Sequence, residues 1–417
     1  MTRLLDGLLV VDFTRVLAGP FAAMVMADLG ARVVKVEPPG GDEARGFGPF
    51  VNGQSLYYTS VNRGKLGVAL NLKTASAVAY ARDLCARADV LLENFRPGTM
   101  RDLGIDYETV RADNPGVVYC SVSGYGQTGP YRARPGLDLI MQGMSGLMSV
   151  TGEPERPPVK VGVPVADLTA AFFAANAVQA ALRVRDRTGQ GQLVDVSLLE
   201  AAVSLEVWET SAYFATGEVP GPIGSAHRAS APYQAFRTAD GYVTLGATTP
   251  RTWSAFCAAA GLDALRDDPR FATNAARKGN EAALAALIEA VTVRETSATW
   301  YARLEAAGVP AGILNRVDQV AADPHLAARD FFVDLPHPAG DTVRTTASPM
   351  RLAATPVRLR RAGPRLGEHD DEILAGAGYT AAERAALRAA GVTGAAAPPQ
   401  HAPAAAPEPP QPQEQPR

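Results

Sequence analysis

Short hydrophobic runs alternate with segments of helical pattern along the first half of the chain. Two of the clearest runs, 8–12 and 32–37, are aliphatic or alternate aliphatic with charged residues, as strands do. Residues 74–87 have a helical pattern. Further strands are predicted at 68–72, 90–95, 117–122 and 192–197. Strands separated by helices form βαβ units, so the pattern predicts an α/β fold with a mainly parallel sheet.

The pattern changes after residue 215. Residues 233–237 and 242–246 alternate hydrophobic and polar side chains around Asp240-Gly241, a sequence typical of a β-hairpin. Helical patterns follow at 252–260, 280–292 and 297–307. We therefore expect a large α/β domain at 1–215, a small α+β domain at 225–330, a return segment completing the large domain at 340–385, and a disordered Pro/Ala/Gln-rich tail at 395–417.

Polar residues follow several of the predicted strands directly. In a parallel sheet, ligands bind outside the carboxyl ends of the strands. The segments expected at that edge are 12–15, Glu37, 71–73, 93–96 and 123–126. A ligand site is therefore predicted along this edge of the sheet.

Composition excludes several classes of function. The 417 residues are 47% hydrophobic and carry a net charge of −3. The chain therefore lacks the basic excess that is typical of nucleic-acid-binding proteins. Cys85, Cys120 and Cys257 lack the spacing of a disulfide framework or zinc site and fit a reducing compartment. The histidines are scattered after residue 226, so neither a metal site nor a Ser-His-Asp triad is expected.

Targeting and membrane segments are not predicted either. Asp6 and Asp12 interrupt the N-terminal apolar run, unlike a signal peptide. The most apolar helical segment, 168–184, contains Asn176 and Gln179 and is expected to be too short and too polar to span a bilayer. This segment carries small apolar residues around nearly its whole circumference, which predicts that the helix is deeply buried. The sequence thus predicts a cytoplasmic protein without a membrane partner.

Gly124-Tyr-Gly126-Gln-Thr-Gly129 follows a predicted strand and has the spacing of a dinucleotide-binding loop. Pro130 follows at once, no apolar helix comes next, and the strand-end acid expected ~20 residues later is missing. Nicotinamide and flavin binding are therefore disfavoured. A glycine loop that lets a ligand approach the backbone fits better.

Asp167 is the only ionisable residue between Lys160 and Arg183, at the start of the Ala-rich helical segment. The local pattern favours a helix N-cap. The same helix amides and dipole would keep a carboxylate ionised and available as a nucleophile. Without a metal, an active cysteine or a nearby histidine, carboxylates remain the candidates for catalysis, and Asp138 is a second acid in the preceding segment.

Six motifs in this order resemble one known family. They are Asp12-Phe-Thr-Arg-Val-Leu-Ala-Gly-Pro20, Asp28-Leu-Gly-Ala-Arg-Val-Val-Lys-Val-Glu-Pro-Pro-Gly40, Asn62-Arg-Gly-Lys65, Glu93-Asn-Phe-Arg-Pro-Gly98, Gly124-Tyr-Gly-Gln-Thr-Gly-Pro130 and Val165-Ala-Asp167. Together they are similar to the class III CoA-transferases (CaiB/BaiF type), a family that includes formyl-CoA transferase and the α-methylacyl-CoA racemases. The likeness extends from about residue 4 to 380.

The resemblance implies a large Rossmann-like parallel-sheet domain plus a small α+β domain, in an interlocked homodimer. It implies CoA and acyl-CoA as substrates, a small carboxylic acid as second substrate, and no tightly bound cofactor. Asp167 matches the family's nucleophile, which forms an aspartyl anhydride and then an aspartyl–CoA thioester. Asp138 matches a family acid near the reacting centre, although it could equally cap a helix at 139–144.

The resemblance also implies a set of CoA contacts at strand ends and beside glycines. They are Arg15, Leu17, Ala18, Leu70, Asn71, Lys73, Asn94, Phe95, Arg96, Arg101 and Arg134. Arg and Lys suit the phosphates of CoA. Each arginine alone could instead be a solvated surface charge.

Departures from the family pattern narrow the activity. Leu137 replaces a histidine of the racemases, which removes one of two proton-transfer bases. Leu17 and Pro38 differ from the formyl-CoA transferases and disfavour formate and oxalate. His227 and Arg228 lie in a segment that resembles the succinyl-CoA:dicarboxylate branch, where they would bind a distal carboxylate or simply belong to a connecting loop.

The expected function is therefore the transfer of CoA from succinyl-CoA, or a similar donor, to a small dicarboxylic acid. An α-methylacyl-CoA racemase or epimerase is the alternative. A non-catalytic CoA-binding protein is the third possibility.

Overall fold

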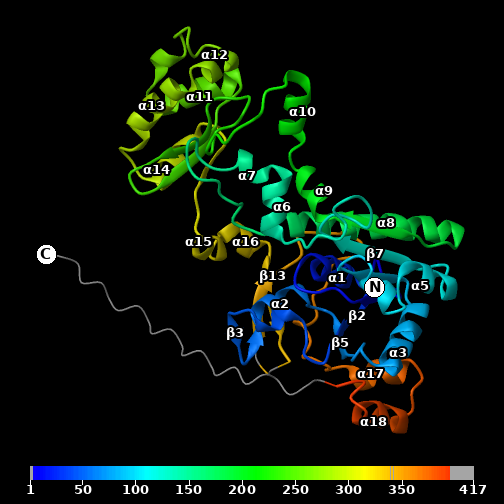
Figure 1. Ribbon diagram of the computed structural model, residues 1–417. Coiled ribbons are helices and arrows are strands. Elements are labelled where there is room, and N and C mark those ends of the chain that lie inside the picture. The colour runs from blue at the N-terminus through cyan, green and yellow to red at the C-terminus, as the bar shows by residue number, and fades with distance from the viewer. Residues whose placement is uncertain (1–2, 339, 341, 395–417) are drawn as a thin grey trace. The chain divides into compact units, whose positions relative to one another are not determined.

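The computed structural model describes residues 3–338, 340 and 342–394. Contacts divide the chain into two compact units (Figure 1). Unit 1 comprises Met1–Met141, Pro164–Ala202 and Phe331–Arg417, and unit 2 comprises Gln142–Val163 and Val203–Asp330. Residues 142–163 and 203–215, which lie within the predicted 1–215 domain, therefore belong by their contacts to unit 2. The tail predicted at 395–417 lies outside the described residues.

Unit 1 is built on a six-stranded parallel sheet of order β5-β2-β1-β6-β7-β8. Its strands are β1 (Leu9–Asp12), β2 (Arg32–Glu37), β5 (Leu66–Ala69), β6 (Val90–Glu93), β7 (Val118–Ser123) and β8 (Leu193–Ser197). This is the strand order of a doubly wound dinucleotide-type fold. The predicted α/β class with a parallel sheet is confirmed, together with additional small antiparallel sheets.

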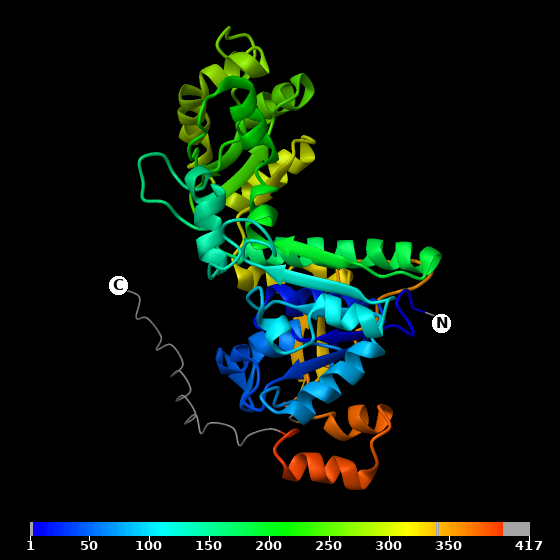
Figure 2. The ribbon, with the colours of Figure 1, turned by 45° about the vertical axis from the view of Figure 1, so that its right-hand side comes forward.

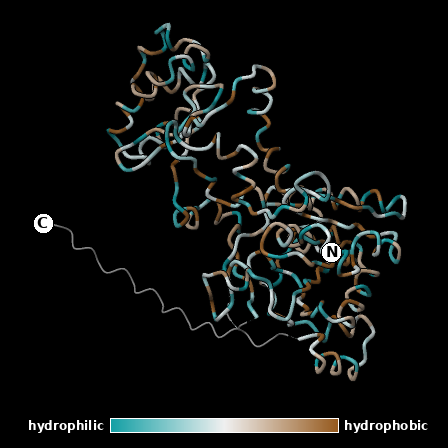
Figure 3. Tube along the Cα trace, viewed as in Figure 1, coloured by the Kyte–Doolittle hydropathy of each residue, from teal (hydrophilic) through white to brown (hydrophobic). Residues whose placement is uncertain are grey.

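The helices of unit 1 that cover this sheet include α1 (Ala18–Asp28), α3 (Ala75–Ala86), α5 (Tyr107–Asp113) and α8 (Val165–Thr188). Shorter elements are η1 (Glu43–Gly46), β3 (Phe50–Val51), β4 (Gln54–Ser55), α2 (Leu56–Val61) and α4 (Thr99–Asp102). Two helices, α6 (Asp138–Ser145) and α9 (Leu198–Val203), contain the points where the chain passes from one unit to the other. Hydrophobic and hydrophilic residues are mixed over short distances along the chain (Figure 3), as amphipathic elements require.

Helix α8 packs against α1 and against strands β7 and β8. Its 24 residues make it longer than the predicted 168–184 segment, and by length and composition alone it could cross a membrane. The prediction that it is too short was therefore wrong. Several of its alanines are buried, whereas Phe172 and Phe173 are exposed in this chain, so burial is one-sided rather than complete. One partly buried core helix is weak evidence for a membrane span.

The C-terminal part of unit 1 begins earlier than residue 340. It opens with an antiparallel hairpin of β12 (Phe332–Pro336) and β13 (Thr342–Thr346), which the sequence pattern did not predict. Two helices follow, α17 (Asp370–Gly376) and α18 (Ala381–Ala389), shown in orange and red in Figure 2. Helix α17 packs on the edge strand β5, and the Asp370 carboxylate accepts the Ala69 amide at 2.9 Å.

Unit 2 has a three-stranded antiparallel sheet of order β11-β10-β9. The predicted hairpin is confirmed at β9 (Tyr233–Arg237) and β10 (Tyr242–Gly246), and β11 (Ala311–Ile313) joins it. The helices are α7 (Leu147–Val150), α10 (Val207–Thr216), α11 (Pro250–Ala260), η2 (Asp263–Leu265), α12 (Asn274–Gly279), α13 (Glu281–Thr292), α14 (Ser297–Ala306), α15 (Val317–Ala321) and α16 (Pro324–Ala328). Their core contains Trp253, Phe256 and Trp300.

Candidate active site

The strand order of the sheet reverses direction between β1 and β6, which are neighbours in space. Such switch points form a crevice at the carboxyl ends of the strands. Here the loops after the two strands are joined by one side chain. The Asn94 carboxamide accepts the Arg15 amide at 2.7 Å and donates to the Arg15 carbonyl at 2.8 Å. Asn94 therefore fixes the backbone of the β1 loop at the predicted ligand edge.

Several residues predicted to contact CoA lie around this junction. The Arg15 guanidinium stacks over the Phe95 ring at 4.9 Å from its centroid and forms an ion pair with Glu43 at 3.2 Å. Leu17 is the N-cap residue of α1, and Ala18 is the first residue of that helix. These four predicted residues and Asn94 thus belong to the ends of β1 and β6.

The other predicted CoA contacts are more dispersed. Leu70 donates its amide to the Glu37 carbonyl at 2.8 Å, and Asn71 donates its amide to the Val392 carbonyl at 2.9 Å, both beyond β5. The exposed residues of this set are Lys73, Arg96, Arg101 and Arg134. Arg134 stacks over the Tyr131 ring at 3.8 Å from its centroid. The Arg101 side chain is 81% exposed and lies 3.8 Å from Asp106.

Asp167 is the third residue of α8, because the helix begins at Val165 after Pro164. The local alternative that Asp167 is the N-cap is therefore wrong. Asp138, the first residue of α6, serves the start of α8 instead. Its Oδ1 accepts the amide of Ala166 at 2.9 Å and that of Asp167 at 3.4 Å. The two acids named from the sequence are thus brought together across 29 positions.

The electrostatic environment of Asp167 differs from the one expected. Burial, and then the neighbouring charge of Asp138, raise the pKa of the Asp167 carboxyl to about 7. The prediction that helix amides keep this carboxylate ionised does not hold, because burial and Asp138 raise its pKa, and the amides of Ala166 and Asp167 are bonded to Asp138. Asp167 is consequently a desolvated acid that is divided between its two protonation states near neutral pH.

The glycine loop after β7 positions Asp138. A Cβ added to Gly124 would lie 3.2 Å from the Gly136 Cα, and one added to Gly136 would lie 2.9 Å from the Gly124 Cα. Only glycines permit so close an approach of two backbone segments. The chain thereby crosses the end of β7 two residues before Asp138. No helix starts at Gly129, and the next helix along the chain is α6 at Asp138.

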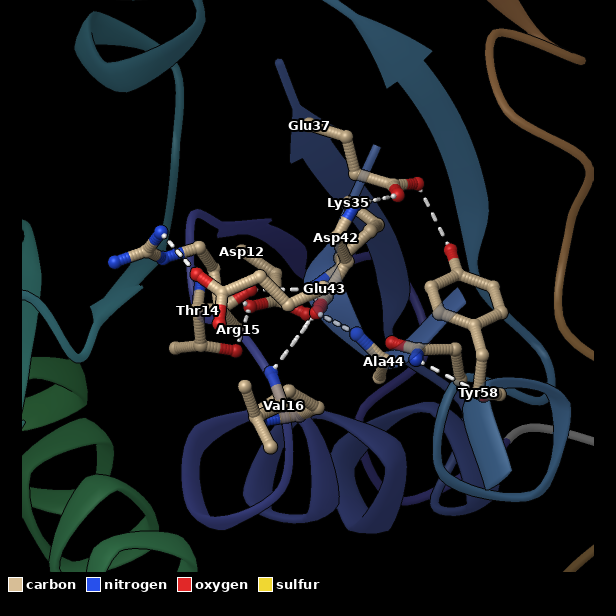
Figure 4. A network of polar contacts seen from close by, with 12 residues as sticks. Asp12, Thr14, Arg15, Val16, Lys35, Glu37, Asp42, Glu43, Ala44 and Tyr58 are labelled. Atoms are coloured by element: carbon tan, nitrogen blue, oxygen red, sulfur yellow. Dashed lines mark hydrogen bonds and ion pairs between the residues drawn. The ribbon is translucent and has the colours of Figure 1, made fainter. Parts of the chain in front are cut away.

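A buried network of charges supports the β1 loop, and the sequence interpretation missed it. Lys35 and Asp42 form an ion pair at 2.9 Å, and Lys65 pairs with Asp12 at 2.8 Å; all four side chains are fully buried. Glu37 binds Arg45 at 2.7 Å. Figure 4 shows that part of this network lies directly beside the loop. Charged residues inside otherwise aliphatic strands, such as Lys35 in β2, were the available signal.

In unit 2, His227 and Arg228 form part of a polar and aromatic cluster. His227 stacks on Tyr233 with centroids 4.9 Å apart and meets the edge of Trp208 at 5.6 Å. The Arg228 Nε donates to Glu209 at 2.6 Å, and its Nη2 donates to the Gly221 carbonyl at 3.1 Å. Arg228 is therefore already paired with a carboxylate on one side of its guanidinium.

Fold and site together define an α/β protein with arginines at a sheet switch point and a desolvated carboxylate at a helix start. The sequence profile of CoA-transferase family III matches residues 5–370. Succinate–glutarate CoA-transferase of Agrobacterium fabrum is 40% identical over 379 residues, which cover 89% of this chain and 95% of that protein. Acetyl-CoA:oxalate CoA-transferase of Acetobacter aceti is 41% identical over 330 residues, covering 79% of this chain and 85% of the relative.

A solved structure agrees with these sequence matches. The crystal structure of a CaiB/BaiF family protein from Brucella suis has a TM-score of 0.82 at 39% identity, covering 90% of this chain and all 100% of that one. The chain belongs to CoA-transferase family III. It is an enzyme of this class, and the names of its relatives favour CoA transfer over the racemase alternative.

Proposed function

We propose that the enzyme moves CoA from an acyl-CoA donor, with succinyl-CoA as the first candidate, to a small dicarboxylic acid, using Asp167 as the nucleophile. The observation that carries the proposal is the desolvated Asp167 carboxyl at the start of α8, in a chain of this family. A carboxylate removed from water is a stronger nucleophile than a hydrated one once it is ionised. The similarity to a succinate–glutarate CoA-transferase supports the choice of donor.

The proposed reaction keeps the acyl group activated throughout. The ionised Asp167 attacks the thioester carbonyl, the C–S bond breaks, and CoA leaves as a thiolate, which gives an aspartyl–acyl anhydride. The thiolate attacks the Asp167 carbonyl carbon, and the donor acid leaves as a carboxylate. The acceptor carboxylate then attacks the aspartyl–CoA thioester, and the same two steps run in reverse. No proton is consumed, because every nucleophile and leaving group is an anion.

The CoA site in this proposal follows the carboxyl edge of the sheet. Arg15, held at the junction of β1 and β6, would bind a phosphate of CoA, and Arg96, Arg101, Arg134 and Lys73 supply further exposed cations. Leu17, the N-cap residue of α1, has no side-chain oxygen to accept the first-turn amides, and an anion would supply one. Leu17, Ala18, Leu70, Asn71, Asn94 and Phe95 complete the proposed set.

His227 and Arg228 are proposed to recognise the distal carboxylate of the acceptor. The cluster around them supports this role, because aromatic side chains fix the imidazole of His227 on two sides. Glu209 and the Gly221 carbonyl bind Nε and Nη2 of Arg228, so a substrate carboxylate would bind at Nη1. The likeness to an oxalate enzyme leaves oxalate among the acceptors to be tested, against the expectation from Leu17 and Pro38.

We also propose a homodimer and a cytoplasmic location. Helix α10 has no buried residue in the single chain, and Phe214 on it is 81% exposed. Exposed aromatic residues on one helix are typical of an interface. Sedimentation of Phe214→Asp beside the wild type tests the dimer: a monomer in the variant supports this helix as interface, and a monomeric wild type contradicts the proposal.

The function is tested by chromatography of CoA esters. Purified protein is incubated with succinyl-CoA or acetyl-CoA and a panel of acids that contains glutarate, oxalate, other dicarboxylates and matched monocarboxylates. A new acyl-CoA with one dicarboxylate, lost in Asp167→Ala, supports both reaction and nucleophile. Deuterium entering the α-position without an acceptor acid would favour the racemase. If neither CoA exchange nor covalent labelling of Asp167 is observed, the result would indicate a non-catalytic CoA-binding protein.

A further inference from the structure

The loop between β1 and α1 contains a strained residue. Val16 has φ of 65°, in the left-handed region that β-branched residues rarely adopt. Such a conformation persists only where the surroundings enforce it, and it is found most often at functional sites. Val16 is 37% exposed, so packing of its side chain does not enforce this conformation. The cause has to be sought in the backbone contacts of the loop.

Asp42 supplies those contacts. The Val16 amide donates to both oxygens of the Asp42 carboxylate, at 3.1 Å and 3.2 Å (Figure 4). The neighbouring residue is held as well, since the Asn94 side chain binds both the amide and the carbonyl of Arg15. Two successive residues of the loop, Arg15 and Val16, are therefore held by side-chain hydrogen bonds from Asn94 and Asp42.

Asp42 is itself rigidly fixed. Its carboxylate accepts Lys35 Nζ at 2.9 Å and the Ala44 amide at 3.0 Å, and its own amide donates to Glu37 at 3.0 Å. Lys35 Nζ also donates to the Thr14 carbonyl, two residues before Val16. Burial opposes ionisation of Asp42, yet Lys35 and the amides of Ala44 and Val16 hold the pKa of Asp42 below its usual value. The carboxylate that accepts the Val16 amide is thus ionised and is held by Lys35 and the Ala44 amide.

We infer that Asp42 is a positioning residue for acyl-CoA: by holding Val16 in its strained conformation, it sets the Arg15 side chain and the first turn of α1 for the nucleotide part of CoA. The inference rests on the proposed CoA site. Released from Asp42, Val16 would relax to negative φ. The backbone on either side would then turn away, moving Arg15 from Phe95 and changing the direction of the α1 amides. CoA binding would weaken while Asp167, on a different element, kept its chemistry.

The test separates acyl-CoA binding from chemistry in three variants. Asp42→Asn removes the charge that grips the Val16 amide. We expect KM for acyl-CoA to rise roughly tenfold, the effect of losing one charge-assisted hydrogen bond, with kcat changed less than about twofold. Val16→Pro leaves the buried ions intact but cannot donate an amide or adopt positive φ, and should raise KM at least as much. The KM for the acceptor acid should stay unchanged in both.

The third variant asks whether the effect passes through Val16. Glycine adopts positive φ without strain, so Val16→Gly combined with Asp42→Asn should restore KM to within about threefold of the wild type. A purely structural role of Asp42 in the core would give no such rescue, and that result would overturn the inference. If Asp42→Asn does not fold, Val16→Pro alone decides: an unchanged KM for acyl-CoA overturns the inference.

Asp28→Asn is the matched control. Asp28 forms a comparable buried ion pair with Arg63 at 2.7 Å, at the other end of α1. Its loss should lower stability without changing KM for acyl-CoA. Calorimetric titration with CoA keeps the two proposals apart. If the wild type binds no CoA, the proposed function fails, whereas equal CoA affinity of wild type and both single variants overturns the inference alone.

Discussion

The Asp138 carboxylate accepts the backbone amide of Asp167 at 3.4 Å, and its charge opposes ionisation of the Asp167 side chain. One residue therefore has two opposite effects on its neighbour. The hydrogen bonds stabilise the first turn of α8 and so fix where Asp167 lies. The negative charge adds to the effect of burial and keeps the pKa of Asp167 near 7. Asp138 thus fixes the position of the proposed nucleophile and, after burial, contributes to its raised pKa.

The first prediction concerns pH. If ionised Asp167 is the nucleophile, kcat/KM should rise with pH and level off above about 7, the pKa that burial and Asp138 give it. Asp138→Asn removes the charge but keeps a side-chain oxygen for the amide of Ala166. The rising limb of kcat/KM against pH should then move to lower pH, measured by following acyl-CoA formation between pH 5 and 9.

Asp138→Ala is the comparison that separates charge from capping. It removes both, so the pH limb should move as in Asp138→Asn while the free energy of unfolding falls by about 1 kcal/mol, the usual value of a helix cap. A pH profile identical in wild type and both variants would show that Asp138 does not influence the ionisation that limits the reaction.

The second prediction concerns stability. The pKa of Asp167 is raised from 3.8 to about 7 in the folded state, so this carboxyl binds its proton more tightly in the folded chain than in the unfolded chain. The contribution of protonated Asp167 to the free energy of unfolding is complete below pH 3.8 and is lost as the pH rises through 7. Asp167→Asn cannot ionise, so at pH 8 it should be inactive but more stable than wild type by about 1–3 kcal/mol.

Urea unfolding of wild type and Asp167→Asn at pH 5 and pH 8 measures this difference. The gain in free energy of unfolding should grow between the two pH values, because only the wild type has a partly buried carboxyl that must ionise as the pH rises. An equal difference at both pH values would mean that the Asp167 carboxyl is not perturbed.

Local pattern predicted the elements whose stability is local. Strand β2 at Arg32–Glu37 and the β9–β10 hairpin were predicted to the residue, because alternating side chains and an Asp-Gly turn specify them within a short window. The hairpin at Phe332–Pro336 and Thr342–Thr346 was missed. Charged residues and a proline interrupt its hydrophobic pattern, and each strand depends on the other.

The site shows the same limit more clearly. Asp167 was named correctly as a helix-start acid, but its assignment as a cap failed, since the acid that caps α8 lies 29 positions earlier in the chain. The pairs of Lys65 with Asp12 and of Asn94 with Arg15 join residues 53 and 79 positions apart. No short window of sequence contains both partners. The sequence therefore predicted which residues belong to the site, but not which of them form hydrogen bonds or ion pairs with one another.

The third prediction concerns substrate choice. Arg228→Ala should raise KM for a dicarboxylate such as glutarate by roughly tenfold, the loss of one charge-assisted contact, and leave KM for a matched monocarboxylate nearly unchanged. Glu209→Gln frees the Arg228 guanidinium from its carboxylate partner and should lower KM for the dicarboxylate. Initial rates with both acids at saturating acyl-CoA measure these effects. Equal changes for the two acids in Arg228→Ala would contradict a role in recognising a distal carboxylate.

The last prediction tests the buried ions beneath the β1 loop. Lys65 Nζ donates to Asp12 at 2.8 Å, to Asn62 at 2.8 Å and to the Pro20 carbonyl at 2.9 Å, with no exposed surface. Lys65→Met leaves all three acceptors in the core without their cation and should lower the free energy of unfolding by about 3–5 kcal/mol.

Arg82→Met is the matched control, because Arg82 and Asp113 form an ion pair of similar length, 2.9 Å, between half-exposed side chains. Water replaces that contact, so the change should stay below about 1 kcal/mol. The double variant Asp12→Asn with Lys65→Met removes the uncompensated charge as well and should recover part of the loss. Chemical denaturation of the three variants decides the point. A loss in Lys65→Met no greater than in Arg82→Met would mean that the buried pair contributes nothing to holding β1, β5 and the start of α1 together.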